Sequence, residues 1–195
     1  PQLTPTMTDA FALLEKPRQP WLEEAALKEN FLNRSAATHP DKFSDPAQKA
    51  GASDRFAALN TAHDTLRDPK LRLRHLIELE TGAPPADVHD IPPDTAELFL
   101  AVGQLLRPVD AFLTEREAQT SPLLRAQSYP AALDWLEQVN TLLTTLNEQL
   151  ADAEATLQKM NDNWTAAELE SVYHQFSYLQ KWRAQLNDRA LRLGQ

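Results

Sequence analysis

The second half of the chain carries two long runs in which apolar residues recur every three or four positions. In the run between residues 131 and 160, these positions include Leu133, Leu136, Leu143, Leu146, Leu150, Ala153 and Leu157. In the run after Thr165, they include Leu169, Val172, Phe176, Leu179, Leu186, Ala190 and Leu193. This spacing marks one face of an α-helix, and the first run would cover about eight helical turns. Helices of that length are typical of bundles and coiled coils, so the pattern predicts a helical bundle.

Glycine and proline usage extends this prediction to the whole chain. Only 4 of the 195 residues are glycine, whereas β-sheets need glycine-rich turns and β-branched strands. The 14 prolines gather at predicted helix boundaries and in the segment 83–93. We therefore expect an all-α protein in which a proline-rich hinge, 83–93, joins two domains, 1–82 and 94–195.

The second domain is expected to form an antiparallel three-helix bundle. Its first helix should begin after Asp94, with an apolar stripe made of Leu98, Phe99, Val102, Leu105 and Leu106. Pro108 should kink or split this helix, because proline lacks the N–H group of a helical hydrogen bond. The polar stretch 118–129 is expected to form a turn before the two long runs complete the bundle.

The first domain carries the marks of four helices. A short one follows Thr8, and a second runs from Pro20 to His39 with two glutamates near its start. Residues 43–50 are expected to form a loop, with Pro46 suited to a first helical turn. The third helix has one apolar face, made of Ala52, Phe56, Leu59, His63 and Leu66. Asp68-Pro69 separates it from a fourth helix, 70–80, which Gly82 ends.

The tripeptide His39-Pro40-Asp41 stands between the second and third predicted helices. Pro40 fixes its own φ and disfavours a helical residue before it, so the second helix must end near His39. An imidazole and a carboxylate therefore lie side by side on a stiff corner between two helices. Taken alone the tripeptide is weak evidence, because His39 and Asp41 could simply cap the helices.

A short helix, a long helix, a His-Pro-Asp corner and another long helix form the order of a J-domain, which residues 1–82 resemble. The segment Leu59–Pro69 resembles the third helix of the J-domain co-chaperones of iron–sulfur cluster assembly, in which the place of His63 is usually taken by tyrosine. Leu71, Arg72 and the residues 74–76 resemble the continuation of that family. In the second domain, the segments 161–167 and 176–181 resemble its final helix, and the family's second domain is also a helical bundle.

The resemblance implies a partner for the corner. Asp41 would engage a basic site on a DnaK-type chaperone of the seventy-kilodalton heat-shock class, while His39 and Pro40 hold the corner in shape. The contact would trigger ATP hydrolysis on the chaperone. Candidates for a supporting basic face are Lys28, Arg34 and Lys42, although neighbouring glutamates on the second helix make a mixed, solvated face the alternative.

The resemblance also implies that the second domain delivers a client, in that family the scaffold protein on which iron–sulfur clusters are built. The candidate client-binding residues are Leu98, Phe99, Leu100 and Arg107. An apolar stripe on a helix is more often part of the core than of an interface, so core packing is the favoured interpretation for most of these leucines. Val102 and Leu105 stand where family members carry glutamates, and this difference leaves a dedicated client other than the iron–sulfur scaffold as an alternative.

Charge and cysteine content exclude several other classes of protein. Residues 83–195 carry 8 basic and 16 acidic side chains, a charge distribution that disfavours nucleic acids and anionic membranes as partners. The chain has no cysteine, so we expect no disulfide, no thiolate zinc site and no metal or other cofactor. No apolar run approaches the ~20 residues of a membrane span, and no secretory signal is visible.

These observations predict a protein of the cytoplasm, or of the mitochondrial matrix if the source is eukaryotic. The five histidines show neither the metalloprotease spacing nor a neighbouring phosphate-binding loop, so we expect no enzyme. His63, on the apolar face of the third helix, is expected to pack in the core. A purely structural helical-bundle protein remains an alternative that explains the second half of the chain but not the corner.

Overall fold

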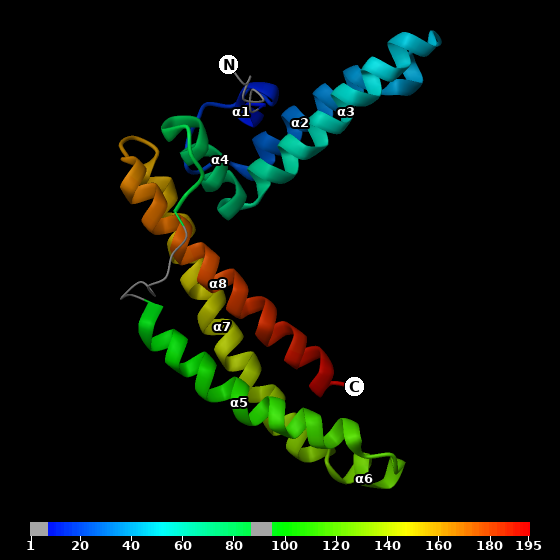
Figure 1. The fold of residues 1–195 in the computed structure, drawn as a ribbon, viewed down its shortest axis with the longest axis vertical. Coiled ribbons are helices and arrows are strands. Elements are labelled where there is room, and N and C mark those ends of the chain that lie inside the picture. The colour runs from blue at the N-terminus through cyan, green and yellow to red at the C-terminus, as the bar shows by residue number, and fades with distance from the viewer. Residues whose placement is uncertain (1–7, 87–94) are drawn as a thin grey trace. The chain divides into compact units, whose positions relative to one another are not determined.

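The computed structural model describes residues 8–86 and 95–195, and every regular element in these two ranges is a helix (Figure 1). The elements are α1 (Ala10–Leu13), α2 (Glu24–Thr38), η1 (Pro40–Lys42), α3 (Pro46–Arg67), α4 (Pro69–Thr81), α5 (Ala96–Ala118), α6 (Pro122–Gln127), α7 (Tyr129–Met160) and α8 (Ala166–Leu193). Here η1 denotes a single turn of 3₁₀-helix. The predicted all-α class is confirmed.

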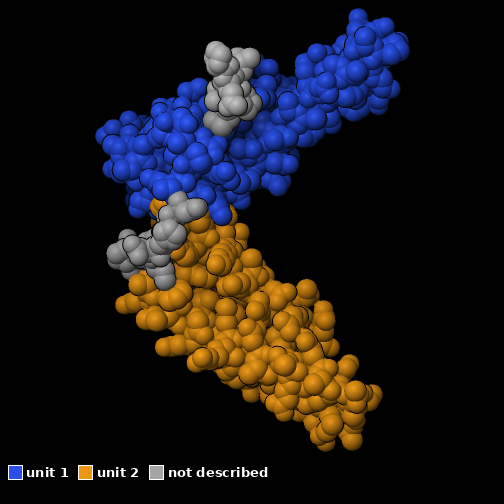
Figure 2. All heavy atoms as spheres, viewed as in Figure 1, with its two compact units in different colours: residues 1–86, 154–173 blue, residues 87–153, 174–195 orange. Residues whose placement is uncertain are grey.

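The chain divides into two compact units, and the first change of unit along the chain, between residues 86 and 87, falls within the predicted hinge 83–93 (Figure 2). Unit 1 contains residues 1–86 and 154–173, and unit 2 contains residues 87–153 and 174–195. The turn between α7 and α8 thus belongs with the first segment of the chain. In this unit the Asn161 side chain accepts the Trp21 N–H at 2.9 Å and donates to the Trp21 carbonyl at 3.0 Å. Most of the predicted hinge, residues 87–93, lies outside the described residues.

The core of unit 1 is organised around α3, which packs against α1, α2 and α4. Helices α2 and α3 lie side by side as an antiparallel hairpin (Figure 1). The largest fully buried side chains of this unit's first segment are Phe11, Leu14, Leu27, Leu66, Leu73 and Leu76. Apolar burial of this kind stabilises a fold by roughly 1.5–3 kcal/mol for each large side chain.

Aspartate caps explain where the helices of unit 1 begin. The Asp45 carboxylate accepts the Gln48 N–H at 2.9 Å, and Pro46 occupies the first turn of α3. Helix α3 therefore starts four residues before the end of the loop predicted for residues 43–50. Asp68 caps α4 in the same way, and Gly82 ends that helix with φ at 75°, a left-handed conformation that glycine adopts at little cost.

In unit 2, buried side chains of α5, α7 and α8 make the core. They include Val102, Val109, Leu113, Val139, Leu146, Phe176, Leu179, Trp182 and Leu186. The Arg189 guanidinium of α8 forms a two-pronged ion pair with Asp110 of α5, with N–O distances of 2.9 and 3.1 Å. This pair joins α5 to α8 with fixed geometry.

The structure narrows two expectations about unit 2. Pro108 does not split α5, which runs unbroken from Ala96 to Ala118. Val102 and Val109 are both buried, so packing of the same helix face on either side of Pro108 compensates for the missing hydrogen bond. The stretch 118–129 is more than a turn, because it contains α6, whose first residue is Pro122. None of the described helices is long and apolar enough to cross a membrane.

Candidate functional site

The corner between α2 and α3 is a compact, hydrogen-bonded turn. Helix α2 ends at Thr38, and His39 is its C-terminal cap with φ at −59° and ψ at 128°, outside the helical region, as expected for a residue that precedes proline. The Lys42 N–H donates to the His39 carbonyl at 3.1 Å, and the Phe43 N–H donates to the Pro40 carbonyl at 3.2 Å. These bonds close η1 and fix the backbone of the tripeptide.

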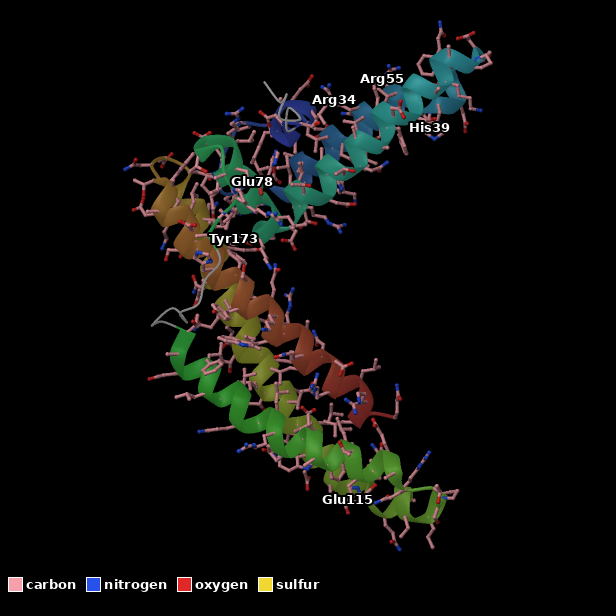
Figure 3. All side chains as sticks on the ribbon, in the orientation of Figure 1. Arg34, His39, Arg55, Glu78, Glu115 and Tyr173 are labelled. Carbon is pink, nitrogen blue, oxygen red and sulfur yellow. The ribbon has the colours of Figure 1, made fainter. Side chains whose placement is uncertain are left out.

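The His39 ring stabilises the turn through a hydrogen bond to its backbone. Its Nδ1 atom accepts the backbone N–H of Asp41 at 3.3 Å. A ring nitrogen that accepts a hydrogen bond carries no proton, so neutral His39 holds its proton on Nε2. The ring also meets Phe56 of α3 edge-on, with centroids 5.4 Å apart. His39 is thereby held between its own turn and the middle of α3 (Figure 3).

The Asp41 carboxylate is exposed to solvent beside the His39 ring. The Asp41 side chain is 76% exposed, and its Oδ2 atom lies 3.6 Å from His39 Nδ1. No other ion pair of Asp41 occurs among the described residues, so the carboxylate is available to a partner. The corner therefore presents one negative charge on a backbone that is already ordered.

The three predicted basic residues differ in their surroundings. Lys42 lies in η1 beside the tripeptide and is exposed, and Lys28 is exposed three turns earlier on α2. Arg34 is half-buried, and its Nη1 atom donates to the carboxylate of Glu15. The corner and Lys42 are thus contiguous, whereas Arg34 is engaged within unit 1 and Lys28 stands apart.

The candidate client residues lie at the start of α5 in unit 2. Leu100 is 59% exposed and Phe99 is 43% exposed, while Leu98 is half-buried. The Phe99 ring also leans on Trp182 of α8, with centroids 6.0 Å apart. Arg107 is exposed, and because it follows Leu100 by seven residues the two share one face of the helix. Leu100 and Arg107 therefore form the outward part of the predicted set.

The two positions that differ from the resembled family point inward. Val102 is buried and Leu105 is half-buried, so both contribute to packing of unit 2. His63 is packed as well, because its ring stacks on Phe31 at 4.2 Å and its side chain is only 14% exposed. His63 thus packs on the hairpin as predicted, although the residue is half-buried and not fully buried in the core.

Sequence reasoning did not identify the structural role of Arg72. This arginine of α4 is 4% exposed, and its Nε and Nη1 atoms each donate at 2.7 Å, to the carbonyls of Pro20 and Leu66. Burial lowers the pKa of the guanidinium to about 10, against the opposing charges of Glu154 and Asp68. Arg72 remains charged at neutral pH and ties α4 to two backbone segments. Buried polar contacts between distant residues have no periodic signature in a sequence.

Comparisons with known proteins agree with the architecture. No family model matches the chain. The co-chaperone protein HscB homolog of Mannheimia succiniciproducens is 35% identical over 78 residues, which are 39% of this chain and 45% of that protein. The homolog of Paraburkholderia phymatum is 38% identical over 71 residues, 35% of this chain and 41% of that protein. The chain is similar to HscB co-chaperones. The match spans less than half the length of these relatives.

Solved HscB structures extend the similarity to almost the whole fold. Human co-chaperone protein HscB superposes with a TM-score of 0.62 at 15% identity, over 95% of this chain and 84% of that one. Chaperone HscB from Vibrio cholerae gives a TM-score of 0.56 at 18% identity, over 93% and 96% of the two chains. The predicted resemblance, and a fold with an N-terminal J-domain and a C-terminal helical bundle, are confirmed.

Proposed function

We propose that this protein is a J-domain co-chaperone that stimulates ATP hydrolysis by a DnaK-type chaperone. The observation that carries the proposal is the corner between α2 and α3, where a braced backbone presents the exposed carboxylate of Asp41. His39 and Pro40 hold the corner, and Asp41 contacts a basic site on the chaperone. The similarity to HscB co-chaperones supports the same assignment.

Rigidity and charge make this contact physically reasonable. A side chain on an ordered turn loses little conformational entropy when it binds, so more of its interaction energy appears as affinity. Exposed Lys28 and Lys42 steer the encounter weakly, because Glu24 and Glu29 on α2 are exposed as well. Arg34 contributes less than these lysines, since its guanidinium already meets Glu15. The protein itself performs no covalent chemistry and needs no cofactor in this proposal.

We further propose that unit 2 delivers the client, with an iron–sulfur cluster scaffold as the first candidate. The exposed residues Leu100 and Arg107, with Phe99 and Leu98 beside them, offer an apolar and basic face. Co-chaperone, chaperone and client must share a compartment, which we expect to be the cytoplasm of a bacterium or the mitochondrial matrix of a eukaryote.

The first experiment measures single-turnover ATP hydrolysis by the DnaK-type chaperones of the source organism. We expect the wild type to accelerate hydrolysis several-fold and the variants Asp41→Asn and His39→Gln to lose that acceleration. Asp134→Asn, at an exposed aspartate of α7 in unit 2, serves as the matched control and should behave as wild type. Failure of the wild type to stimulate any of these chaperones would refute the proposal.

A second experiment addresses the client. Binding of the iron–sulfur scaffold protein is measured by calorimetry for the wild type, for Leu100→Ser and for Leu124→Ser. Leu124 of α6 is 49% exposed in the same unit, so it controls for the loss of any exposed leucine. Selective loss of binding in Leu100→Ser supports the α5 face. Stimulation of the chaperone without binding of the scaffold would instead indicate a different dedicated client.

A further inference from the structure

His75 of α4 is a buried histidine that connects α4 to the first helix. Its Nε2 atom accepts the backbone N–H of Ala10, the first residue of α1, at 3.0 Å, and the residue is 8% exposed. Its ring stacks on Phe11, with centroids 5.8 Å apart and planes 15° apart. A four-residue helix is too short to be stable by itself, so α1 depends on such contacts.

The hydrogen bond requires one protonation state of the imidazole. Nε2 can accept the Ala10 N–H only when it carries no proton, which leaves the proton of neutral His75 on Nδ1. In the imidazolium form Nε2 becomes a donor and faces another donor. Both groups are buried, so each would lack a hydrogen-bond partner, at a cost that water cannot offset without an opening of the contact.

The groups around His75 have opposing effects on its pKa. Burial lowers the pKa of His75, the carboxylates of Asp9 and Glu78 favour the charged form, and the Arg18 guanidinium disfavours it. Arg74 lines the same cavity as His75, a space of about 400 Å³ between α1, α3 and α4 that gives protons a route to the ring. The net effect is a pKa below the ordinary value of 6.5, so the neutral form persists at neutral pH.

We propose that His75 is an acid-sensitive latch: protonation of its imidazole breaks the bond to Ala10 and releases α1 from α4. The sign follows from linkage. A histidine that is harder to protonate when folded contributes stability above its unfolded pKa of about 6.5 and loses that contribution as the pH falls below it toward the folded pKa. Release of α1 would expose Phe11 and Leu14, which are fully buried in the latched form.

The capping aspartate does not titrate in the same window. Burial alone would raise the pKa of Asp9, but hydrogen bonds from Arg18 and from the Ala12 and Phe11 amides, together with the charge of Arg18, bring that pKa below its ordinary value of 3.8. Asp9 therefore stays charged between pH 5.5 and 7.5, the range of the experiment below, and any change of α1 in that range is independent of its cap.

The test is amide hydrogen exchange of Ala10 and its neighbours in α1, corrected for the intrinsic pH dependence of exchange. Between pH 7.5 and 5.5, opening of the wild-type Ala10 amide should increase about tenfold, the ratio expected when a group of unfolded pKa about 6.5 charges only in the open state. His75→Gln keeps an acceptor that does not titrate, and its opening should change less than about twofold. His63→Gln, which removes a packed histidine that contacts Phe31 instead of α1, should retain the wild-type response.

The inference is overturned if wild-type opening does not change between the two pH values, or if His75→Gln retains the full response. If His75→Gln folds poorly, a second measurement on the wild type still tests the inference. Nitrogen-15 spectra of the wild-type imidazole should show Nε2 unprotonated and Nδ1 protonated at pH 7.5, and the opposite tautomer would also overturn the inference.

Discussion

Two histidines of unit 1 make the same kind of hydrogen bond in different surroundings. At the corner, His39 accepts the Asp41 N–H at 3.3 Å, and 45% of its side chain is exposed. Against α1, His75 accepts the Ala10 N–H at 3.0 Å with 8% of the residue exposed. Water can replace the first bond readily, whereas the second cannot break without exposure of apolar surface. The corner is therefore suited to presenting side chains, and the contact of α4 with α1 is suited to holding the fold.

The largest effect on stability is expected at the buried contact between α4 and α1. Phe11→Ala removes an aromatic side chain that is fully buried beside His75. We expect a loss of about 3–5 kcal/mol in the free energy of unfolding of unit 1, measured by urea denaturation. Ala12→Ser, on the exposed side of α1, should change this free energy by less than about 0.5 kcal/mol. Equal effects of the two substitutions would show that α1 does not depend on its buried face.

Arg72→Ala should rank next. The substitution leaves the carbonyls of Pro20 and Leu66 without their charged donor, and we expect a loss of about 2–3 kcal/mol in the same urea experiment. The control is Arg74→Ala, two residues along α4, where the exposed pair with Glu78 is worth about 0.3–0.5 kcal/mol. If both alanine variants lose the same small amount of unfolding free energy, burial does not make Arg72 more important for stability than Arg74.

Asn161→Ala tests the attachment of the α7–α8 turn. It removes both bonds to the Trp21 backbone, in a partly buried place, and should lower the stability of unit 1 by about 1–2 kcal/mol. Asn163→Ala, in the same turn but exposed, should stay within about 0.5 kcal/mol of the wild type. Thermal unfolding followed by circular dichroism separates the two variants. A neutral Asn161→Ala would mean that the turn needs no anchor at Trp21.

The smallest effect on stability is expected at the corner, together with a large effect on activity. Pro40→Ala should cost only about 0.5–1 kcal/mol, because it mainly increases the freedom of the unfolded chain. Stimulation of chaperone ATPase should nevertheless fall several-fold, since a looser backbone presents Asp41 less often. Pro46→Ala, in the first turn of α3, should have a similar effect on stability and leave stimulation unchanged. Unaltered stimulation by Pro40→Ala would contradict the proposed role of corner rigidity.

Local signals made much of this fold predictable. The spacing of apolar residues identifies α3, α7 and α8, and Asp68-Pro69 and Gly82 mark the ends of α4 as the structure has them. Helix α6 escaped prediction because its six residues are too few to show periodicity. The sequence alone left open whether Pro108 kinks or splits α5, because packing between helices, which keeps this helix unbroken, leaves no local signal.

Pairings between distant residues could not be predicted. On a helical wheel Arg34 looks available to a partner. In the structure its guanidinium donates to Glu15, which is 19 residues away in the sequence. Trp21 and Asn161 are separated by 140 residues, so no local pattern indicates that the α7–α8 turn belongs to unit 1. By contrast, His39, Pro40 and Asp41 are consecutive, and the geometry of the corner follows from the order of three residues and the restraint that proline imposes.

Asn161 imitates a structure that the described part of this protein otherwise lacks. Its carboxamide meets the Trp21 backbone through one accepted and one donated bond, at 2.9 and 3.0 Å, as a residue of a neighbouring β-strand would. One side chain thus supplies a single rung of a β-ladder between helical segments. Such mimicry leaves little choice of residue: aspartate has no N–H to donate, serine is too short, and glutamine is one carbon too long for the same register. The identity of this amide is therefore set by backbone pairing rather than by helix packing.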